Sequence, residues 1–203
     1  MVNRKDTTPL PKQRLLLTKE ELKAIYKLNK QRAKVMEREV CRYLGASRTL
    51  MSGAGSEKGD GFYQNVIVIE CKVSSALHRS LGPTIRVQVD WIRKLKKDVD
   101  AMRSLGARLG ILVLKYHTWR EKIICIPVEY LPELEALSGV LIPEAKEIVP
   151  LGYSAKGKAL VGISISRVLA LQLVGSVVAT AAGDFYITTI DVLKGWLEQE
   201  TVT

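Results

Sequence analysis

The chain has 203 residues, 47% of them hydrophobic and 26% charged, and its formal net charge is +10. This apolar content can build a core, so it excludes an extended disordered chain, and the length suits one domain with a sizeable extension or two small domains. The positive charge favours a polyanionic partner, nucleic acid first and an anionic membrane second.

The positive charge is concentrated in two segments. Residues 1–34 contain ten Lys or Arg and three acidic residues, and residues 86–108 contain seven and three. Pro9 and Pro11 lie among the charges of residues 1–17, which we predict to be a flexible basic arm. This arm is a nucleic-acid candidate, because flexible cationic side chains gain from counterion release.

The three cysteines, Cys41, Cys71 and Cys125, are odd in number and widely spaced. They match neither a zinc site nor a disulfide framework, and Cys71 and Cys125 are expected to be core thiols. The first twenty residues are polar and basic, without the apolar stretch of a secretory signal. We therefore expect a reducing cytoplasmic setting, which is the host cytoplasm if the source is viral.

Helical and strand patterns alternate along the chain. A capping box of Thr18 and Glu21 predicts a helix that ends at Gly45. Its expected core-facing positions are Leu22, Ile25, Ala33, Met36, Val40 and Leu44. Further along, we predict strands near 48–51, 66–72, 84–87, 109–116 and 122–126, and helices over 89–105, 129–138 and 190–199, the last capped by Thr189.

These elements predict an α/β protein in which helices flank a mixed sheet. We expect a core over residues 18–139, with residues 140–203 as a C-terminal extension that packs on it and is a candidate dimerisation segment. Within the extension, residues 163–183 fit a helix and alternating strands equally well. The uncharged run 168–183 is shorter than the roughly 20 residues that a bilayer requires, so we expect a buried helix or strand pair and no membrane.

The residues that suggest chemistry are Asp60, Glu70 and Lys72. Glu70 and Lys72 are two apart on a predicted strand, so their side chains share a face. A carboxylate and an ammonium are costly to bury at the end of the apolar run 66–69, and a partner must compensate them. A divalent cation between Asp60 and Glu70, with Lys72 beside a phosphate, is one such arrangement.

This arrangement suits phosphodiester hydrolysis, which requires an oriented water and neutralisation of charge on the phosphoryl group. Hard carboxylate oxygens suit Mg²⁺, which lowers the pKa of a bound water and clamps phosphoryl oxygens. Lys72 is placed to stabilise developing charge or to orient the attacking water.

The predicted hairpin sets a geometric condition on this site. A plain two-residue turn at residues 64–65 would pair Asp60 with Ile69 and turn Asp60 away from Glu70. The site therefore requires a three-residue loop, a bulge, or an Asp60 that lies just outside the strand.

The motif Gly-Asp60-(x)9-Glu70-Cys-Lys72 resembles that of the PD-(D/E)xK nuclease superfamily. Within this superfamily the chain is most similar to the archaeal and viral Holliday junction resolvases, over residues 34–131. The motifs that carry this resemblance are Glu37-Arg38, Arg48 followed by Ser52-Gly53, Gln88 at the start of a helix, and the apolar strand Ile111–Lys115.

The resemblance implies a restriction-endonuclease-like fold and metal-dependent cutting of branched, four-way DNA by a homodimer. By the resemblance, Glu37, Asp60, Glu70 and the backbone carbonyl of Cys71 bind Mg²⁺, with Mn²⁺ as a substitute. Lys72 is catalytic by the same resemblance, and Ser52 lies near the scissile phosphate. The implied DNA contacts are Arg38, Arg48, Ser52, Lys58, Gln88 and Lys115.

Alternatives remain at this stage. Glu39 competes with Glu37 for the helix position, and Glu37 is preferred because it lies on the apolar side of the helix. Asp60 fits a turn residue between glycines, with Glu70 and Lys72 as a structural ion pair. The chain also fits another nuclease of this fold, restriction-like or DNA-end-processing, a non-catalytic DNA-binding protein of this fold, or a membrane-surface or scaffold protein.

Overall fold

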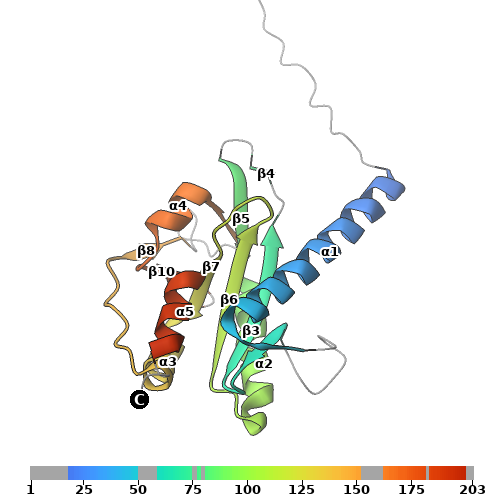
Figure 1. The fold of residues 1–203 in the computed structure, drawn as a ribbon. Coiled ribbons are helices and arrows are strands. Elements are labelled where there is room, and N and C mark those ends of the chain that lie inside the picture. Colours follow the sequence, from blue (N-terminus) through green and yellow to red (C-terminus); the bar gives the residue numbers. More distant parts are fainter. Residues whose placement is uncertain are drawn as a thin grey trace, which may run out of the picture.

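The computed structural model describes residues 18–49, 59–74, 77–78, 81–151, 162–181 and 183–199. The chain is an α/β protein in which helices flank a mixed sheet (Figure 1). The helices are α1 (Lys19–Leu44), α2 (Val89–Met102), α3 (Leu131–Ser138), α4 (Arg167–Gln172) and α5 (Ile190–Glu198), with short 3-10 turns η1 (Arg103–Leu105) and η2 (Val128–Tyr130). The strands are β1 (Ser47–Arg48), β2 (Gly61–Tyr63), β3 (Ile67–Ser74), β4 (Leu77–His78), β5 (Gly82–Gln88), β6 (Leu109–Tyr116), β7 (Ile123–Pro127), β8 (Ile148–Pro150), β9 (Gly162–Ser166), β10 (Val177–Ala179) and β11 (Phe185–Thr189).

The main sheet of the described residues has eight strands in the order β1-β2-β3-β6-β7-β11-β10-β8. Strands β3 and β6 are parallel and are joined through α2, whereas most other neighbours are antiparallel. A second sheet, of three strands, has the order β4-β5-β9. Strands β3 and β6 are therefore a parallel pair inside the main sheet, and their buried, mostly apolar residues are expected for strands covered on both sides.

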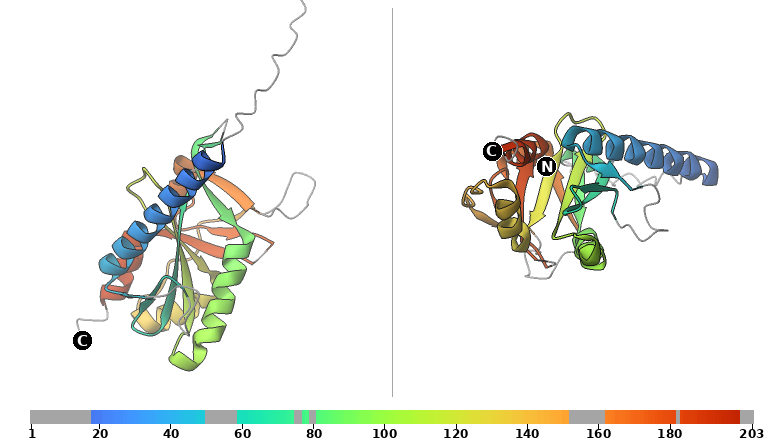
Figure 2. Two further views of the ribbon diagram at one scale, coloured as in Figure 1. Left: turned by 90° about the vertical axis from the view of Figure 1, so that its right-hand side faces the viewer. Right: turned by 60° about the horizontal axis from the view of Figure 1, so that its bottom comes forward.

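Two glycines show that α1 and α2 cover opposite faces of this sheet. A Cβ on Gly61 would meet the Sγ of Cys41 on α1, and a Cβ on Gly110 would meet Leu95 and Val99 on α2. Gly61 pairs with residue 69 of β3 and Gly110 pairs with residue 68, so the two glycines lie on opposite faces. Figure 2 shows the two helices on either side of the sheet.

Helix α1 begins at the predicted capping box, in which the Thr18 and Glu21 side chains each accept a hydrogen bond from the other's backbone N–H. It ends at Gly45, which is in the left-handed conformation that favours glycine. Of the expected core positions, Met36, Val40 and Leu44 are buried, but Ile25 is 42% exposed. The prediction that Ile25 faces the core was wrong, because the first half of α1 extends beyond the sheet (Figures 1 and 2).

The elements between residues 66 and 138 follow the predicted order. Strand β6 has the predicted bounds, and the helix predicted over 89–105 is α2 followed by the 3-10 turn η1. The strand predicted near 84–87 is longer, because residues 84–88 of β5 pair with β9 from the C-terminal part and residues 82–83 pair with β4.

Residues beyond 140 add strands to both sheets. Strand β11 pairs with β7 and β10, and β8 pairs with β10 at the edge of the main sheet. The ambiguous stretch 163–183 contains β9, α4 and β10, and α5 is capped by the Thr189 side chain as predicted. None of the helices in the described ranges has the length and hydropathy of a membrane span.

Candidate active site at strand β3

Two carboxylates are buried beside the middle of β3. Glu70 is 2% exposed and Asp60 is 8% exposed. Residues 67–69, which precede Glu70, are fully buried apolar side chains. Neither carboxylate is solvated, so each needs a partner in the protein or in a ligand.

The hairpin between β2 and β3 meets the geometric condition predicted from the sequence. Tyr63 pairs with Ile67, which leaves a three-residue loop in which Gln64 and Asn65 have positive φ. The last pair of this ladder is Gly61 with Ile69, and Asp60 lies just outside β2. Its N–H donates to the carbonyl of Ile69 at 2.7 Å, so Asp60 and Gly61 both lie against Ile69, as in a β-bulge, and Asp60 is not paired with Glu70.

The Asp60 carboxylate accepts a hydrogen bond from the backbone N–H of Cys71, with Oδ2 and N 2.7 Å apart. Burial raises the pKa of Asp60 to about 6, the negative charges of Glu70 and Glu37 add to this rise, and the Cys71 hydrogen bond and Lys72 oppose it. Asp60 is therefore a carboxylate with too little neutralising charge around it.

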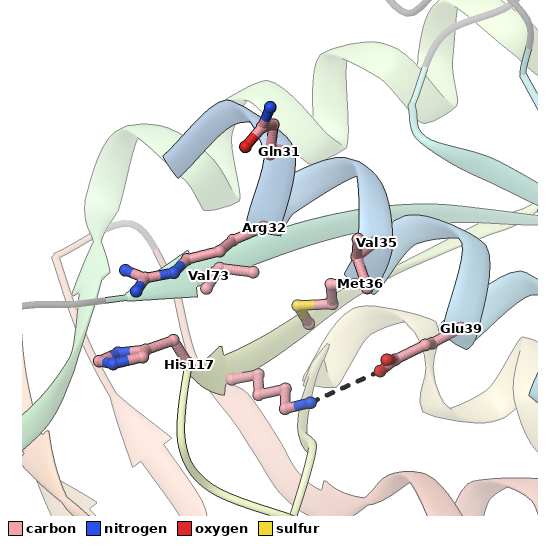
Figure 3. A pocket seen from close by; sticks show the side chains of 8 residues that line it. Gln31, Arg32, Val35, Met36, Glu39, Val73 and His117 are labelled. Atoms are coloured by element: carbon pink, nitrogen blue, oxygen red, sulfur yellow. Dashed lines mark hydrogen bonds and ion pairs between the residues drawn. The ribbon is translucent and has the colours of Figure 1, made fainter. Parts of the chain in front are cut away.

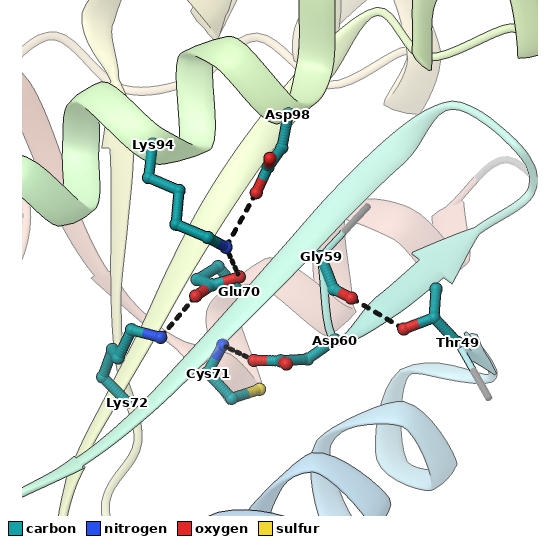
Figure 4. Close-up of polar contacts among 8 residues, drawn as sticks. All are labelled: Thr49, Gly59, Asp60, Glu70, Cys71, Lys72, Lys94 and Asp98. Atoms are coloured by element: carbon teal, nitrogen blue, oxygen red, sulfur yellow. Dashed lines mark hydrogen bonds and ion pairs between the residues drawn. The ribbon is translucent and has the colours of Figure 1, made fainter. Parts of the chain in front are cut away.

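Glu70 has stronger partners. One of its oxygens forms an ion pair with Lys72, and the other lies 3.0 Å from the Nζ of Lys94 on α2. Lys94 also pairs with Asp98, one turn further along α2, at 2.8 Å. Figure 4 shows Glu70 between the two lysines, and Asp60 directed at the backbone of Cys71.

Lys94 and Asp98 were not among the predicted site residues. Burial lowers the pKa of Lys94, but its contacts with Asp98 and Glu70 outweigh burial and leave the pKa raised, so Lys94 is a firmly charged cation. The sequence signal was an i,i+4 Lys–Asp pair next to the apolar stripe of α2. In the sequence this pair looks like an ordinary ion pair on the solvent-exposed side of a helix. Only the position of α2 over β3 brings Lys94 to Glu70.

Lys72 and Gln88 lie near the first turn of α2. The Nζ of Lys72 is 5.8 Å from the centre of the Trp91 ring, at the outer limit of a cation–π contact. Gln88 is the residue before α2, in extended conformation, and its side chain forms no capping hydrogen bond. Gln88 was predicted at the start of a helix, and it is the N-cap residue of α2.

The two glutamates of α1 have different surroundings. The half-buried Glu37 acts by charge repulsion on Asp60. Glu39 lies on another side of α1, where its Oε2 is 3.5 Å from the Nζ of Lys115 and 3.6 Å from that of Lys122. Glu37 is therefore the α1 carboxylate that faces Asp60.

Lys115, predicted to contact DNA, lines a pocket of about 270 Å³ that is distinct from the carboxylate site (Figure 3). The other lining residues come from α1, β3 and the turn after β6: Gln31, Arg32, Val35, Met36, Glu39, Val73 and His117. The structure therefore places Lys115 with Glu39 and not with Glu70.

Of the other residues predicted to contact DNA, two belong to the part of the chain that the structure describes and two do not. Arg48 is exposed on β1, and Arg38 is exposed on α1 with its Nε donating to the carbonyl of Lys34 at 3.2 Å. Ser52 and Lys58 lie outside the described residues. Cys71 and Cys125 are buried and free, as expected, and Cys41 is buried and free as well.

The carboxylates are not gathered around one point. In the described ranges, no group of three or more His, Cys, Asp or Glu side chains is placed to hold a metal ion. Glu70 is turned toward α2, and Asp60 toward the backbone of β3. The donor chemistry nevertheless suits Mg²⁺, since Asp60, Glu70 and Glu37 carry hard carboxylate oxygens and Asp60 lacks neutralising charge.

Comparisons with protein-family models, with curated proteins and with solved structures found no match to this chain.

Proposed function

We propose that this protein is a metal-dependent DNA endonuclease of the PD-(D/E)xK type that resolves four-way junctions by paired nicks. The observation that carries the proposal is the register of the β2–β3 hairpin. The hairpin brings the buried Asp60 beside β3, where its carboxylate accepts a hydrogen bond from the N–H of Cys71, between the buried Glu70 and Lys72 in the sequence. The order of β2, β3, α2 and β6 also agrees with a restriction-endonuclease-like core.

Each residue has a proposed role. Asp60, Glu70, Glu37 and the carbonyl of Cys71 would hold Mg²⁺ or Mn²⁺, and the bound ion supplies a water of lowered pKa and neutralises phosphoryl charge. Lys72, with 27% of its side chain exposed, is accessible enough to donate to a phosphate oxygen. Lys94 would keep Glu70 neutralised until the ion binds.

The proposal includes a homodimer, because two nicks on opposed strands require two active sites. Sedimentation of the purified protein tests this part directly. A protein that remains a monomer both alone and on a four-way junction would contradict the dimer.

A second candidate function is a DNA-binding protein of the same fold that does not cut. One observation favours it: both oxygens of Glu70 are already paired with ammonium groups, as in a structural ion-pair network. The two candidates differ in whether a metal ion displaces these lysines.

The test is cleavage of an immobile four-way junction and of a matched linear duplex, with Mg²⁺ or Mn²⁺. It compares the wild-type protein with Asp60→Asn and Glu70→Gln, and with Asp184→Asn as a control at an exposed aspartate. We expect symmetric nicks on the junction for the wild type and the control, and loss of cleavage with retained binding for the two site variants.

Each other outcome has a definite reading. Cleavage of both DNAs would keep the nuclease and overturn junction specificity. Junction binding without cleavage by the wild type, in either metal, would establish the second candidate instead. Cleavage that survives both site variants would show that the reaction occurs elsewhere in the chain.

A further inference from the structure

Six cationic side chains follow one flank of α1. They recur three or four residues apart, and residues at this spacing share one side of a helix. We call this set the α1 basic flank; its members are Lys19, Lys23, Lys27, Lys30, Lys34 and Arg38.

The basic flank is open to solvent. All six side chains belong to exposed residues, and none forms an ion pair within the part of the chain that the structure describes. The first half of the flank lies on the part of α1 that extends beyond the sheet (Figures 1 and 2). Unpaired charges of one sign along an exposed helix repel each other, so the flank is suited to a polyanion.

The flank leads to the candidate active site. Glu37 is three residues after Lys34 and seven after Lys30, so it lies on the same side of α1. Cys41, one turn beyond Glu37, is close enough for its Sγ to donate to the carbonyl of Asp60, at 4.0 Å. A polyanion bound along the flank would therefore reach the carboxylates at one end.

The charge and length of the flank identify its partner. From Lys19 to Arg38 the helix rises about 28 Å, which is the length of about eight base pairs of duplex DNA. A second copy of α1 would bring like charges together. An anionic membrane is a broad plane, whereas the flank is a narrow line that ends at buried carboxylates, which suits a single phosphate backbone better.

We propose that the α1 basic flank binds the phosphate backbone of one duplex arm of the substrate and directs that arm into the candidate active site. The inference rests on the proposed nuclease function and adds a requirement on the substrate. Productive binding needs a duplex arm of about eight base pairs on one side of the cleavage point.

The first test removes charge from the flank. The variant carries Lys23→Gln, Lys27→Gln and Lys30→Gln, which retain helix propensity. The matched control carries Lys97→Gln, Arg108→Gln and Arg120→Gln, which remove the same charge from exposed positions outside α1. Circular dichroism checks that both fold, and junction affinity is measured over a series of salt concentrations without divalent metal.

We expect the flank variant to bind the junction at least tenfold more weakly and to lower the slope of log affinity against log salt by about 2 to 3, because each phosphate contact contributes about 0.9. The control should change both much less. Equal losses in the two variants would overturn the proposal, since the effect would then come from net charge alone.

The second test shortens the DNA. Reducing the junction arms to about four base pairs, half the length of the flank, should weaken wild-type binding but leave the flank variant little changed. Arm-length dependence that is the same in both proteins would overturn the proposal. Flank-dependent binding to phosphatidylserine vesicles, with no flank effect on DNA, would identify a membrane as the partner and would also overturn it.

These outcomes separate the inference from the proposed function. Binding that depends on the flank, without cleavage, supports the inference and removes the nuclease. If the flank variant cleaves at the wild-type rate and with the wild-type dependence on arm length, the inference is wrong and the nuclease function stands.

Discussion

At the scale of single residues, the site is defined by how two buried carboxylates are neutralised. Glu70 has two lysines, whereas Asp60 has one backbone hydrogen bond and two carboxylate neighbours that repel it. Asp60 is therefore destabilising when it is charged. A residue that costs stability in the free protein and becomes favourable beside a cation is typical of a functional site.

The first residue-scale prediction concerns pH and Asp60. Its pKa is raised from 3.8 to about 6, so the folded state binds more protons than the unfolded state between these values. The favourable contribution is complete below pH 3.8 and is lost as pH rises through about 6. Asp60→Asn should remove this loss and, at neutral pH in EDTA, raise the free energy of unfolding by about 2–3 kcal/mol.

Urea unfolding at several pH values measures this effect. The control Asp184→Asn, at an exposed residue, should keep the wild-type pH profile. If the free energy of unfolding of Asp60→Asn depends on pH in the same way as that of the wild type, ionisation of Asp60 does not destabilise the folded protein.

The second residue-scale prediction concerns Lys94. Lys94→Met leaves Glu70 with Lys72 alone and leaves the buried Asp98 without its ion pair, so stability should fall by about 1–3 kcal/mol. Lys97→Met, at an exposed position of the same helix, should change it little. Thermal unfolding at neutral pH compares the two, and equal melting temperatures would show that Lys94 does not stabilise Glu70.

At the scale of elements, the close approach of α1 to β2 brings Glu37 toward Asp60. Gly61 permits this approach, because its missing side chain leaves room for Cys41. Gly45 ends α1 so that β1 can return alongside β2. The helix and the hairpin therefore position the site together.

Gly61→Ala tests this packing. The added Cβ would lie 2.5 Å from the Sγ of Cys41, so stability should fall by about 1–3 kcal/mol. The loss should be smaller in a Cys41→Ala background, where the clash is relieved. Denaturant unfolding of the wild type, the two single variants and the double variant gives the coupling energy between residues 61 and 41. Additive effects would contradict the contact between the new Cβ and the Cys41 Sγ.

Gly195→Ala is the control for adding a methyl group, because no atom lies within 4 Å of the new Cβ in α5. It should stabilise the protein by about 0.5–1 kcal/mol.

At the scale of the whole molecule, the C-terminal part completes the sheet that holds the site. Strand β11 lies between β7 and β10, and Phe185, Ile187 and Leu193 belong to the same core as β3 and β6. Without them, β7 would become an exposed apolar edge.

A chain that ends at Gly139 should therefore not fold into a stable unit. We expect no cooperative thermal transition by circular dichroism, together with aggregation on gel filtration. A chain that ends at Gln199, and so retains α5, should melt like the full chain. A cooperative transition in the shorter protein would show that residues 18–139 form a self-sufficient core.

What the sequence determined by itself was local. The capping box at Thr18, the bounds of β6 and the departure of the β2–β3 hairpin from a plain two-residue turn all depend on residues close together in the chain. Caps, periodicity and register obey short-range geometry, so they could be predicted without a fold.

What only the tertiary structure decided depends on distant residues. Lys94 is 24 residues from Glu70, and its partnership exists because α2 crosses back over β3. Ile25 is exposed because α1 is longer than the sheet that it covers, and the ambiguous stretch 163–183 contains β9 because β5 offers an edge to pair with. Burial and charge pairing are set by whatever the fold places opposite a residue, and no local pattern encodes that neighbour.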